Sequence, residues 1–179
     1  MLFRSQSSGI SVLPSPGSLN GLPAMSFEIM ARLIGFMKTE FDFMVVDCGH
    51  TLNDLSLKVV EMSDTLLLLS TLNIPCLANT SKLMTTICSL GYLPQERVEI
   101  VINRHTKNSE ISVKEATREL KKEFFWLIPN DYPNTMKAIN QGKTLAQIAP
   151  RASISKNFKT LAEKLAPSEE TKKKRWLFF

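Results

Sequence analysis

Four short apolar runs recur along the chain, and none of them alternates strictly with polar residues. They are Phe41–Val46, Thr65–Ser70, Val98–Ile102 and Phe124–Ile128. Each run is too short for a helix and is rich in residues that favour strands. Continuous runs of this kind are typical of strands that are buried on both faces of a parallel sheet. A weaker fifth run, Ile10–Leu13, precedes Pro14 and is a candidate for a further strand.

Apolar residues spaced three and four apart predict helices between these runs and after the last one. The predicted helices cover Leu19–Lys38, Asp54–Met62, Ala78–Leu90, Ser112–Glu123, Tyr132–Gln141 and Ser155–Leu165. Asn53 is suited to cap the second helix, and Gly91 is suited to end the third. This alternation predicts an α/β fold, doubly wound, in which a mostly parallel sheet carries helices on both faces.

The composition fits one ordinary globular domain, with 44% apolar and 22% charged residues among 179. We expect residues 1–9 to be a disordered start, residues 10–166 to form the domain, and residues 167–179 to form a tail. No stretch approaches the roughly 18 apolar residues of a spanning helix. The three cysteines form no CxxC pair, which favours buried thiols in a reducing compartment. We therefore expect a cytoplasmic protein.

The net charge of +5 is mild, and much of it lies at the end of the chain. The remaining charge forms no stripe of the kind that binds nucleic acid, so no nucleic-acid partner is expected.

Polar residues follow the predicted strands directly, at the sheet edge where open α/β proteins bind ligands. Asp47 follows the first run in the pattern of a Walker B acid, which holds Mg²⁺ through water and orients phosphates. It is equally well interpreted as a carboxylate that caps the loop at Gly49, and the pattern leaves both interpretations open. His50 is interpreted as a loop residue bonded to backbone.

The residues Gln141–Thr144 contain the GKT ending of a Walker A loop, but we interpret the match as accidental. A Walker A loop has a glycine five residues before the one at position 142, and Lys137 stands there. It also lies between a strand and a helix, whereas a helix is predicted before this segment.

Five segments form a characteristic ordered set: Phe41–His50, Leu52–Asp54, Val101–Arg104, Ile128–Tyr132 and Ala138–Lys143. In this order and spacing they resemble the MinD/ParA-type P-loop ATPases, and most closely the TadZ/CpaE group associated with assembly and polar localisation of Flp-type pili. The similarity covers roughly residues 10 to 166.

The resemblance implies an ATP-binding, dimerising switch protein that positions machinery at a cell pole or membrane. It gives Asp47 a place near Mg²⁺, bound through water, and the γ-phosphate. It gives Asn103 a contact with adenine, and it makes Arg104, Pro129 and Asp131 further nucleotide contacts. ATP and Mg²⁺ are thus the implied cofactors. The implied partners are a second copy or another chain of a pilus assembly machine.

One part of the family pattern is not found in this sequence. Family members begin with a strand, a glycine-rich and lysine-rich P-loop variant and a switch aspartate, and residues 1–9 contain none of these. We therefore expect residues 10–166 to correspond to the C-terminal two-thirds of such a domain. Because the loop supplies the dominant stabilisation of the triphosphate, we expect a non-hydrolysing partner or localisation module.

The C-terminal tail combines a basic run with aromatic residues. Its candidate membrane-contact residues are Lys172, Lys173, Lys174, Arg175, Trp176 and Phe178. Cations are attracted to an anionic membrane surface, and aromatic side chains favour the headgroup boundary. The expected location is therefore the cytoplasm, with peripheral contact at the inner face of the membrane. The alternative is a solvated tail whose last residues pack on the domain or on a partner.

Two other functions remain open from the sequence. A receiver-like signalling domain would be phosphorylated on Asp47, with Ser70 or Thr71 as its hydroxyl, but Asn103 and Arg104 stand where it needs a lysine. A non-functional fragment would expose an unpaired sheet edge, which invites association with another chain.

Overall fold

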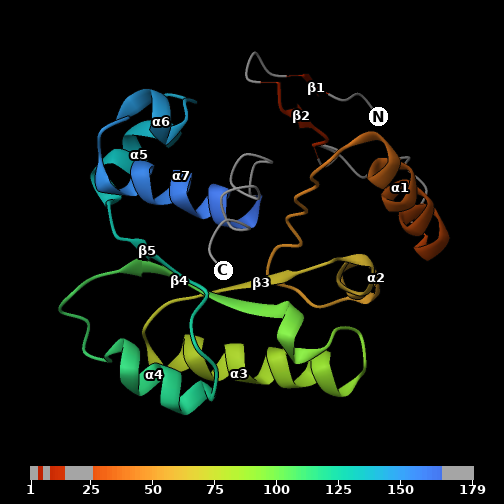
Figure 1. Ribbon diagram of the computed structural model, residues 1–179, viewed down its shortest axis with the longest axis horizontal. Helices are drawn as coiled ribbons and strands as arrows, with labels where there is room; N and C mark the ends of the chain where they lie inside the picture. The colour runs from red at the N-terminus through yellow and green to blue at the C-terminus, as the bar shows by residue number, and fades with distance from the viewer. Residues whose placement is uncertain (1–3, 6–8, 15–25, 167–179) are drawn as a thin grey trace, which may run out of the picture.

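The computed structural model describes residues 4–5, 9–14 and 26–166. Its centre is a parallel sheet of three strands, β3 (Leu66–Ser70), β4 (Val98–His105) and β5 (Trp126–Pro129), in the order β3-β4-β5. Helices α3 (Ile74–Ser89) and α4 (Val113–Leu120) lie on one face of this sheet. Helices α5 (Tyr132–Asn140) and α7 (Ser153–Leu165) lie on the other side (Figure 1). The predicted fold class is confirmed.

Strand β4 explains why both faces of the sheet are covered. Its side chains point alternately to opposite faces. Val98, Ile100 and Ile102 are buried in one cluster with residues of α3 and α4. Val101 points the other way, into a second cluster with Ile154 of α7. The continuous apolar run therefore reflects a strand that has a helical layer on each side.

Helix α7 is held on β5 by polar contacts as well as by apolar packing. The Trp126 Nε1–H donates to Asn157 Oδ1 at 2.9 Å, and Asn157 Nδ2 donates to the Leu127 carbonyl at 3.0 Å. The Lys164 ammonium donates to the Phe125 carbonyl at 3.0 Å and lies 3.9 Å from the centre of the Phe125 ring. These bonds satisfy polar groups at the interface between helix and sheet.

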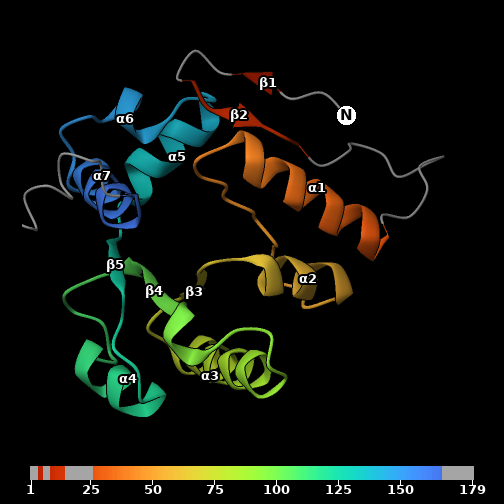
Figure 2. The same ribbon diagram turned by 45° about the vertical axis from the view of Figure 1, so that its right-hand side comes forward.

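The remaining elements lie before the sheet in the chain, lead into β4 or join α5 to α7. Helix α1 (Phe27–Glu40) lies alongside α2 (Asp54–Met62) (Figure 2). A 3₁₀ turn, η1 (Gln95–Arg97), leads into β4. The short helix α6 (Leu145–Ile148), which the sequence pattern missed, begins with a capping box between Thr144 and Gln147. None of the described helices is long and apolar enough to cross a membrane.

The first predicted strand is wrong. Phe41–Val46 forms no regular strand, and Val45 is 97% exposed. A strand is defined by its partner, and no described strand pairs with residues 42–46. The weak run Ile10–Leu13 contributes only β2 (Ser11–Val12), which pairs antiparallel with β1 (Arg4–Ser5) instead of joining the parallel sheet.

Several predicted boundaries shift for local reasons. Helix α3 begins four residues early, because Asn73 caps it and Pro75 fits its first turn. Helix α4 ends at Leu120, because Lys121 takes the left-handed conformation with φ 52°. Helix α1 begins at Phe27 behind its cap, Ser26, and residues 15–25 lie outside the described part. Most of the start predicted to be disordered and the whole basic tail also lie outside it.

We expect Asn157→Ala to destabilise the domain by about 1–3 kcal/mol, because it leaves the half-buried Trp126 N–H and the Leu127 carbonyl without partners. Urea unfolding followed by circular dichroism measures the change. Lys159→Ala, at an exposed position of the same helix, is the matched control and should shift stability by less than about 0.5 kcal/mol. Equal effects of the two changes would contradict a specific role of Asn157.

Candidate functional site

The carboxyl end of β4 contains a β-bulge. The pairing Ile102↔Leu127 is followed by His105↔Pro129, so Asn103 and Arg104 stand opposite Ile128 alone. Arg104 takes the left-handed conformation, with φ 54°, and its backbone N–H donates to Asn103 Oδ1 at 2.9 Å. Bulges of this kind re-aim side chains at the rim of a sheet. The half-buried Asn103 and the exposed Arg104 are therefore turned out of the regular pleat at this rim.

The segment after β5 lies beside this bulge. His105 pairs with Pro129, and the Asn130 N–H donates to the His105 carbonyl at 2.9 Å. The structure thus brings three of the predicted nucleotide contacts, Asn103, Arg104 and Pro129, to one edge of the sheet.

Asp131 is close to this edge in the chain, but its carboxylate caps helix α5. It accepts from the Asn134 backbone N–H at 3.2 Å and from Asn134 Nδ2 at 2.8 Å. These bonds give Asp131 a structural role that the sequence pattern did not assign to it. Its role as a nucleotide contact stays a prediction.

Asp47 stands in the segment between α1 and α2. Its Oδ1 accepts from the Gly49 N–H at 2.8 Å, and Gly49 takes the left-handed conformation with φ 67°. The structure therefore contains the turn-capping contact that was one of the two interpretations of this residue.

Asp47 also lines a cavity of about 200 Å³ between α1, α2 and the segment that joins them. The lining residues are Met30, Val46, Asp47, Cys48, Asn53, Leu55, Ser56 and Val59. None of the residues at the β4 bulge is among them, so the structure does not join the proposed metal and base contacts into one cavity. Ser70 and Thr71 do not line this cavity either. The cavity therefore does not place beside Asp47 the hydroxyl that a receiver-like site needs.

The described residues offer few ligands for a bound Mg²⁺. They contain no group of three or more His, Cys, Asp or Glu side chains placed to hold a metal. Mg²⁺ keeps several waters and is commonly held by one or two carboxylates together with substrate phosphates. One carboxylate, Asp47, fits a water-mediated contact of that kind, provided that a nucleotide supplies the remaining oxygens.

Hydrogen bonds of the Asn73 side chain fix the turn between β3 and α3. Asn73 Nδ2 donates to the Thr71 hydroxyl at 2.8 Å, and Asn73 Oδ1 accepts from the Cys76 N–H at 2.9 Å. The sequence signal for this cap was the Asn-X-Pro pattern at positions 73–75, which is typical of a helix start.

Two of the three free thiols differ in acidity. A hydrogen bond with the Thr71 side chain, helped by Asn73 and the Thr71 backbone, lowers the pKa of the Cys76 thiol against a smaller opposing effect of burial. Partial removal from water, and then the negative charge of Asp47, raise the pKa of the Cys48 thiol. The thiolate of Cys76 therefore forms at lower pH than that of Cys48.

The GKT segment is a turn between two helices, as the sequence interpretation holds. Helix α5 precedes it, Gly142 has φ 59°, and the Lys143 N–H donates to the Ala138 carbonyl. Thr144 caps the four-residue helix α6. Its backbone N–H groups therefore close the end of one helix and begin another, and they do not converge on a phosphate site.

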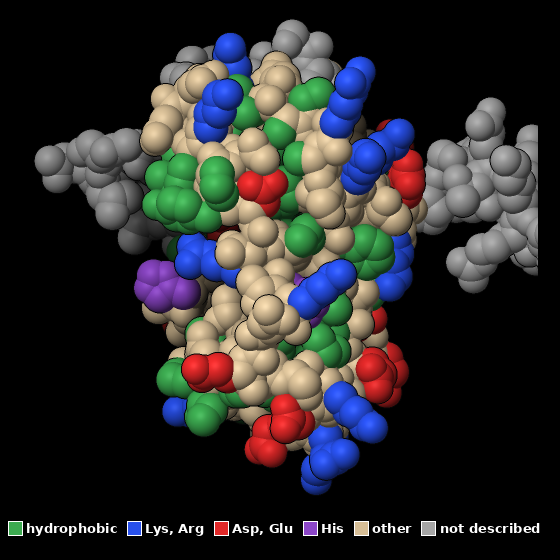
Figure 3. All heavy atoms as spheres, turned by 90° about the vertical axis from the view of Figure 1, so that its left-hand side faces the viewer, with side chains coloured by type: hydrophobic (Ala, Val, Ile, Leu, Met, Phe, Trp, Pro, Cys, Tyr) green, Lys and Arg blue, Asp and Glu red, His purple; other side chains and the backbone are tan. Residues whose placement is uncertain are grey.

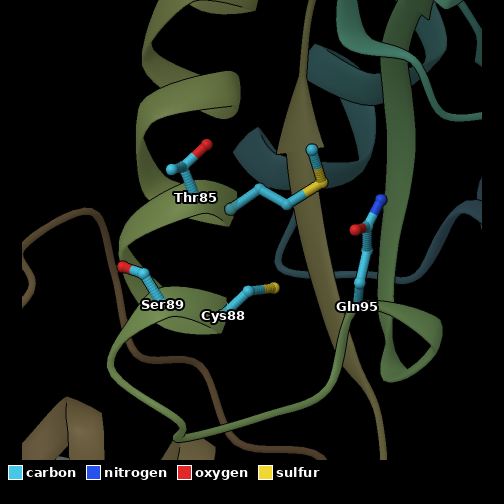
Figure 4. Close-up of a pocket in the computed structure, with 5 residues that line it drawn as sticks. Thr85, Cys88, Ser89 and Gln95 are labelled. Carbon is cyan, nitrogen blue, oxygen red and sulfur yellow. The ribbon is translucent and has the colours of Figure 1, made fainter.

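A shallow hollow of about 370 Å³ lies between the C-terminal half of α3 and the start of η1 (Figure 4). Met84, Thr85, Cys88, Ser89 and Gln95 line it, and none of them is charged. On the face seen in Figure 3, Lys and Arg side chains are spread out and interspersed with Asp and Glu. An anionic ligand would meet mixed charge on that face and no continuous basic field.

No protein-family model matches the chain, and no curated protein sequence matches it significantly. Solved structures do match. A ParA family ATPase from Chlorobium tepidum TLS is similar with a TM-score of 0.82 and 24% identity, over 89% of this chain and 66% of that one.

Two proteins from Pyrococcus species show the same likeness at lower TM-scores. The cell division ATPase MinD of Pyrococcus furiosus gives 0.63 and 24% identity, over 76% of this chain and 56% of that one. The septum site-determining protein MinD of Pyrococcus horikoshii OT3, solved with Mg-ADP, gives 0.64 and 21%, over 77% and 56%. The chain therefore has the MinD/ParA-type, P-loop NTPase-like fold, and it spans less than two thirds of the length of these proteins.

We expect the rate of Cys76 alkylation by iodoacetamide to reach its plateau at lower pH than that of Cys48, because only thiolates react. Peptide mass spectrometry across a pH series separates the sites. Thr71→Val should move the Cys76 midpoint to higher pH without moving that of Cys48, and Asp47→Asn should lower the Cys48 midpoint alone. Identical midpoints at both thiols would contradict these environments.

Proposed function

We propose that this chain is a nucleotide-responsive partner or localisation module of TadZ/CpaE type, which helps to assemble or position Flp-type pili. In this proposal it binds the adenine side of a nucleotide at the β4 bulge and does not hydrolyse ATP by itself. The observation that carries the proposal is the placement of Asn103 and Arg104 beside Pro129, on the fold that it shares with a MinD solved with Mg-ADP.

The side chains at the β4 bulge are suited to recognise the adenine base of a nucleotide. An asparagine amide carries both a donor and an acceptor, as the edge of adenine requires. Asn103 Oδ1 already accepts from the Arg104 N–H, and this bond fixes the plane of the amide. The amide Nδ2 is then oriented to donate to a ring nitrogen, while Arg104 adds an exposed cation at the same edge.

We propose nucleotide binding without ATP hydrolysis because the sequence contains no candidate for a phosphate-binding loop. The GKT segment is a helix–helix turn, and the 179 residues contain no other candidate for a Walker A loop. Without such a loop, the backbone N–H groups and lysine that stabilise the transferring phosphoryl group are not supplied by these residues. Asp47 would contribute a water-mediated Mg²⁺ contact, and Mg²⁺ would add charge neutralisation on the phosphates.

The proposed partners follow from the sequence resemblance. We propose a homodimer or a complex with another chain of the pilus assembly machine, and peripheral contact with the inner face of the membrane. The candidate membrane residues, Lys172–Arg175 with Trp176 and Phe178, lie outside the described residues. Their role rests on their charge and aromatic character alone.

We expect a fluorescent adenine nucleotide to bind the purified chain, and Asn103→Ala to weaken it by about 3- to 10-fold, the loss of one hydrogen bond. Fluorescence anisotropy measures the dissociation constant. Asn108→Ala, an exposed asparagine in the loop after β4, is the matched control and should have no effect. Phosphate release should stay at the level of the protein-free blank. Turnover of ATP by the chain alone, or equal affinities of the two variants, would contradict the proposal.

We expect sedimentation with anionic phospholipid vesicles to need the basic tail. Each Lys or Arg contributes about 1 kcal/mol at such a surface, so replacing Lys172–Arg175 by Gln should lower the partition coefficient by roughly two to three orders of magnitude. The control replaces four exposed cations of the folded domain, Lys107, Lys114, Arg118 and Lys121. If both quadruple variants lose binding equally, the tail has no specific role.

A further inference from the structure

Charge is divided unevenly between two parts of the described chain. Residues 26–130 carry thirteen Asp or Glu and eleven Lys or Arg side chains. Residues 131–166, which contain α5, α6 and α7, carry only two acids, Asp131 and Glu163, and six cations. The six cations, all of them exposed, are Lys137, Lys143, Arg151, Lys156, Lys159 and Lys164. We call residues 131–166 the basic layer.

Carboxylates of the described residues do not neutralise the cations of the basic layer. All four ion pairs of the described part of the chain lie between Lys38 and Lys122, outside this layer. Lys164 is engaged with the carbonyl and the ring of Phe125. The other five cations make no ion pair with a described residue. The basic layer therefore presents a net positive charge to its surroundings.

The three helices of the basic layer pack on one another, on the side of the sheet opposite α3 and α4 (Figure 1). In α7, Ile154 and Leu161 are buried against the sheet. Lys156 and Lys159 are exposed, and because they stand three residues apart they are neighbours on the helix surface. The face in Figure 3 has α5 and α6 in its upper part and α4 in its lower part, and acidic side chains gather mainly in the lower part.

Helix α7 is also the helix from which the chain continues into the basic tail. It ends at Leu165, and Lys172, the first cation of the tail, follows seven residues later. A chain spans at most about 3.6 Å per residue, so this cation stays within roughly 25 Å of the end of α7. Any surface that the tail contacts is therefore held near the C-terminal end of α7.

We propose that the basic layer faces the same anionic phospholipid surface as the tail and makes a second, electrostatic contact with it. The inference deepens the proposed membrane contact of the tail and rests on it. The attraction of a Lys or Arg side chain to such a surface falls off within a Debye length, about 8 Å at physiological ionic strength. The exposed cations therefore lie close to the headgroups, and the domain is oriented with α3 and α4 away from the membrane.

A fluid lipid surface suits these cations better than a single anionic ligand or a nucleic acid does. The cations are spread over α5, α7 and the turns beside α6, and none of them lines either cavity described above. A discrete anion needs cations that converge on it, and a nucleic acid needs a stripe that follows its phosphates. Anionic lipids diffuse laterally and can gather beneath cations that are spread out. The aromatic end of the tail, Trp176–Phe179, adds side chains that favour the headgroup boundary.

Sedimentation with vesicles of phosphatidylglycerol and phosphatidylcholine tests this contact. The layer variant combines Lys143→Gln, Arg151→Gln, Lys156→Gln and Lys159→Gln. The matched α4 variant removes the same net charge from exposed positions on the other side of the sheet, by Lys107→Gln, Lys114→Gln, Arg118→Gln and Lys121→Gln. We expect the layer variant to lower the partition coefficient about tenfold or more, and the α4 variant to lower it by less than about twofold.

Acetylation of lysines by N-hydroxysuccinimide acetate tests the orientation of the unsubstituted chain. The same vesicles should slow the modification of Lys156 and Lys159 by roughly threefold or more, because the headgroups cover these side chains. They should leave the modification of Lys114 and Lys121 unchanged. Peptide mass spectrometry separates these sites. This measurement does not depend on the folding of the layer variant, which circular dichroism checks separately.

Equal losses in the layer variant and the α4 variant would overturn the inference, because net charge alone would then explain binding. Binding that depends on Lys172–Arg175 but not on the layer would overturn it too, while leaving the proposed role of the tail intact. If the parent chain does not sediment with anionic vesicles, the proposed membrane contact fails together with the inference. Duplex DNA binding, measured by fluorescence anisotropy, that the layer variant loses while it keeps vesicle binding would assign the layer to nucleic acid instead.

Discussion

The described structure depends on the burial of β4 between two helical layers. Val98, Ile100 and Ile102 of this strand enter the cluster beneath α3 and α4, while Val101 enters the cluster beneath α7. A strand buried on both faces has to obtain its backbone hydrogen bonds from its neighbours, because no water reaches it. β3 and β5 provide those bonds on the two sides of β4. The parallel order of the sheet, the two helical layers and the position of the strand ends all follow from this constraint.

The same constraint produces the candidate base site. Where β4 leaves the buried layers, an extra residue enters the strand, and Arg104 takes up a left-handed conformation to accommodate it. The bulge carries Asn103 and Arg104 out of the pleat at the point where Pro129 ends β5. A polar edge is therefore created by the irregular end of an otherwise regular and apolar strand. Asp47 is outside this system, because the segment that carries it is not part of the sheet in the described residues.

Local patterns predicted those parts of the fold that depend on short-range physics. Helix α2 has the predicted bounds, because Asn53 and Ser56 form a capping box and the apolar spacing follows at once. The strands β3, β4 and β5 follow from continuous apolar runs, and the dismissal of the GKT segment follows from the helix before it. The bulge could not be predicted, because Asn103 and Arg104 also suit a simple strand-end turn. The capping role of Asp131 was missed because its position after Pro129 also suited a ligand contact.

The sequence by itself determined the α/β class, the order of strands β3 to β5 with the helices between them, and the residues that stand at the ends of these strands, since these depend on periodicity and on capping side chains. Only the tertiary structure decided that Phe41–Val46 is not a strand among the described residues and that Asp47 and Asn103 do not share a cavity. The physical reason is that hydrophobic periodicity records which side chains require burial, whereas a strand or a site exists only where a second segment supplies its partner.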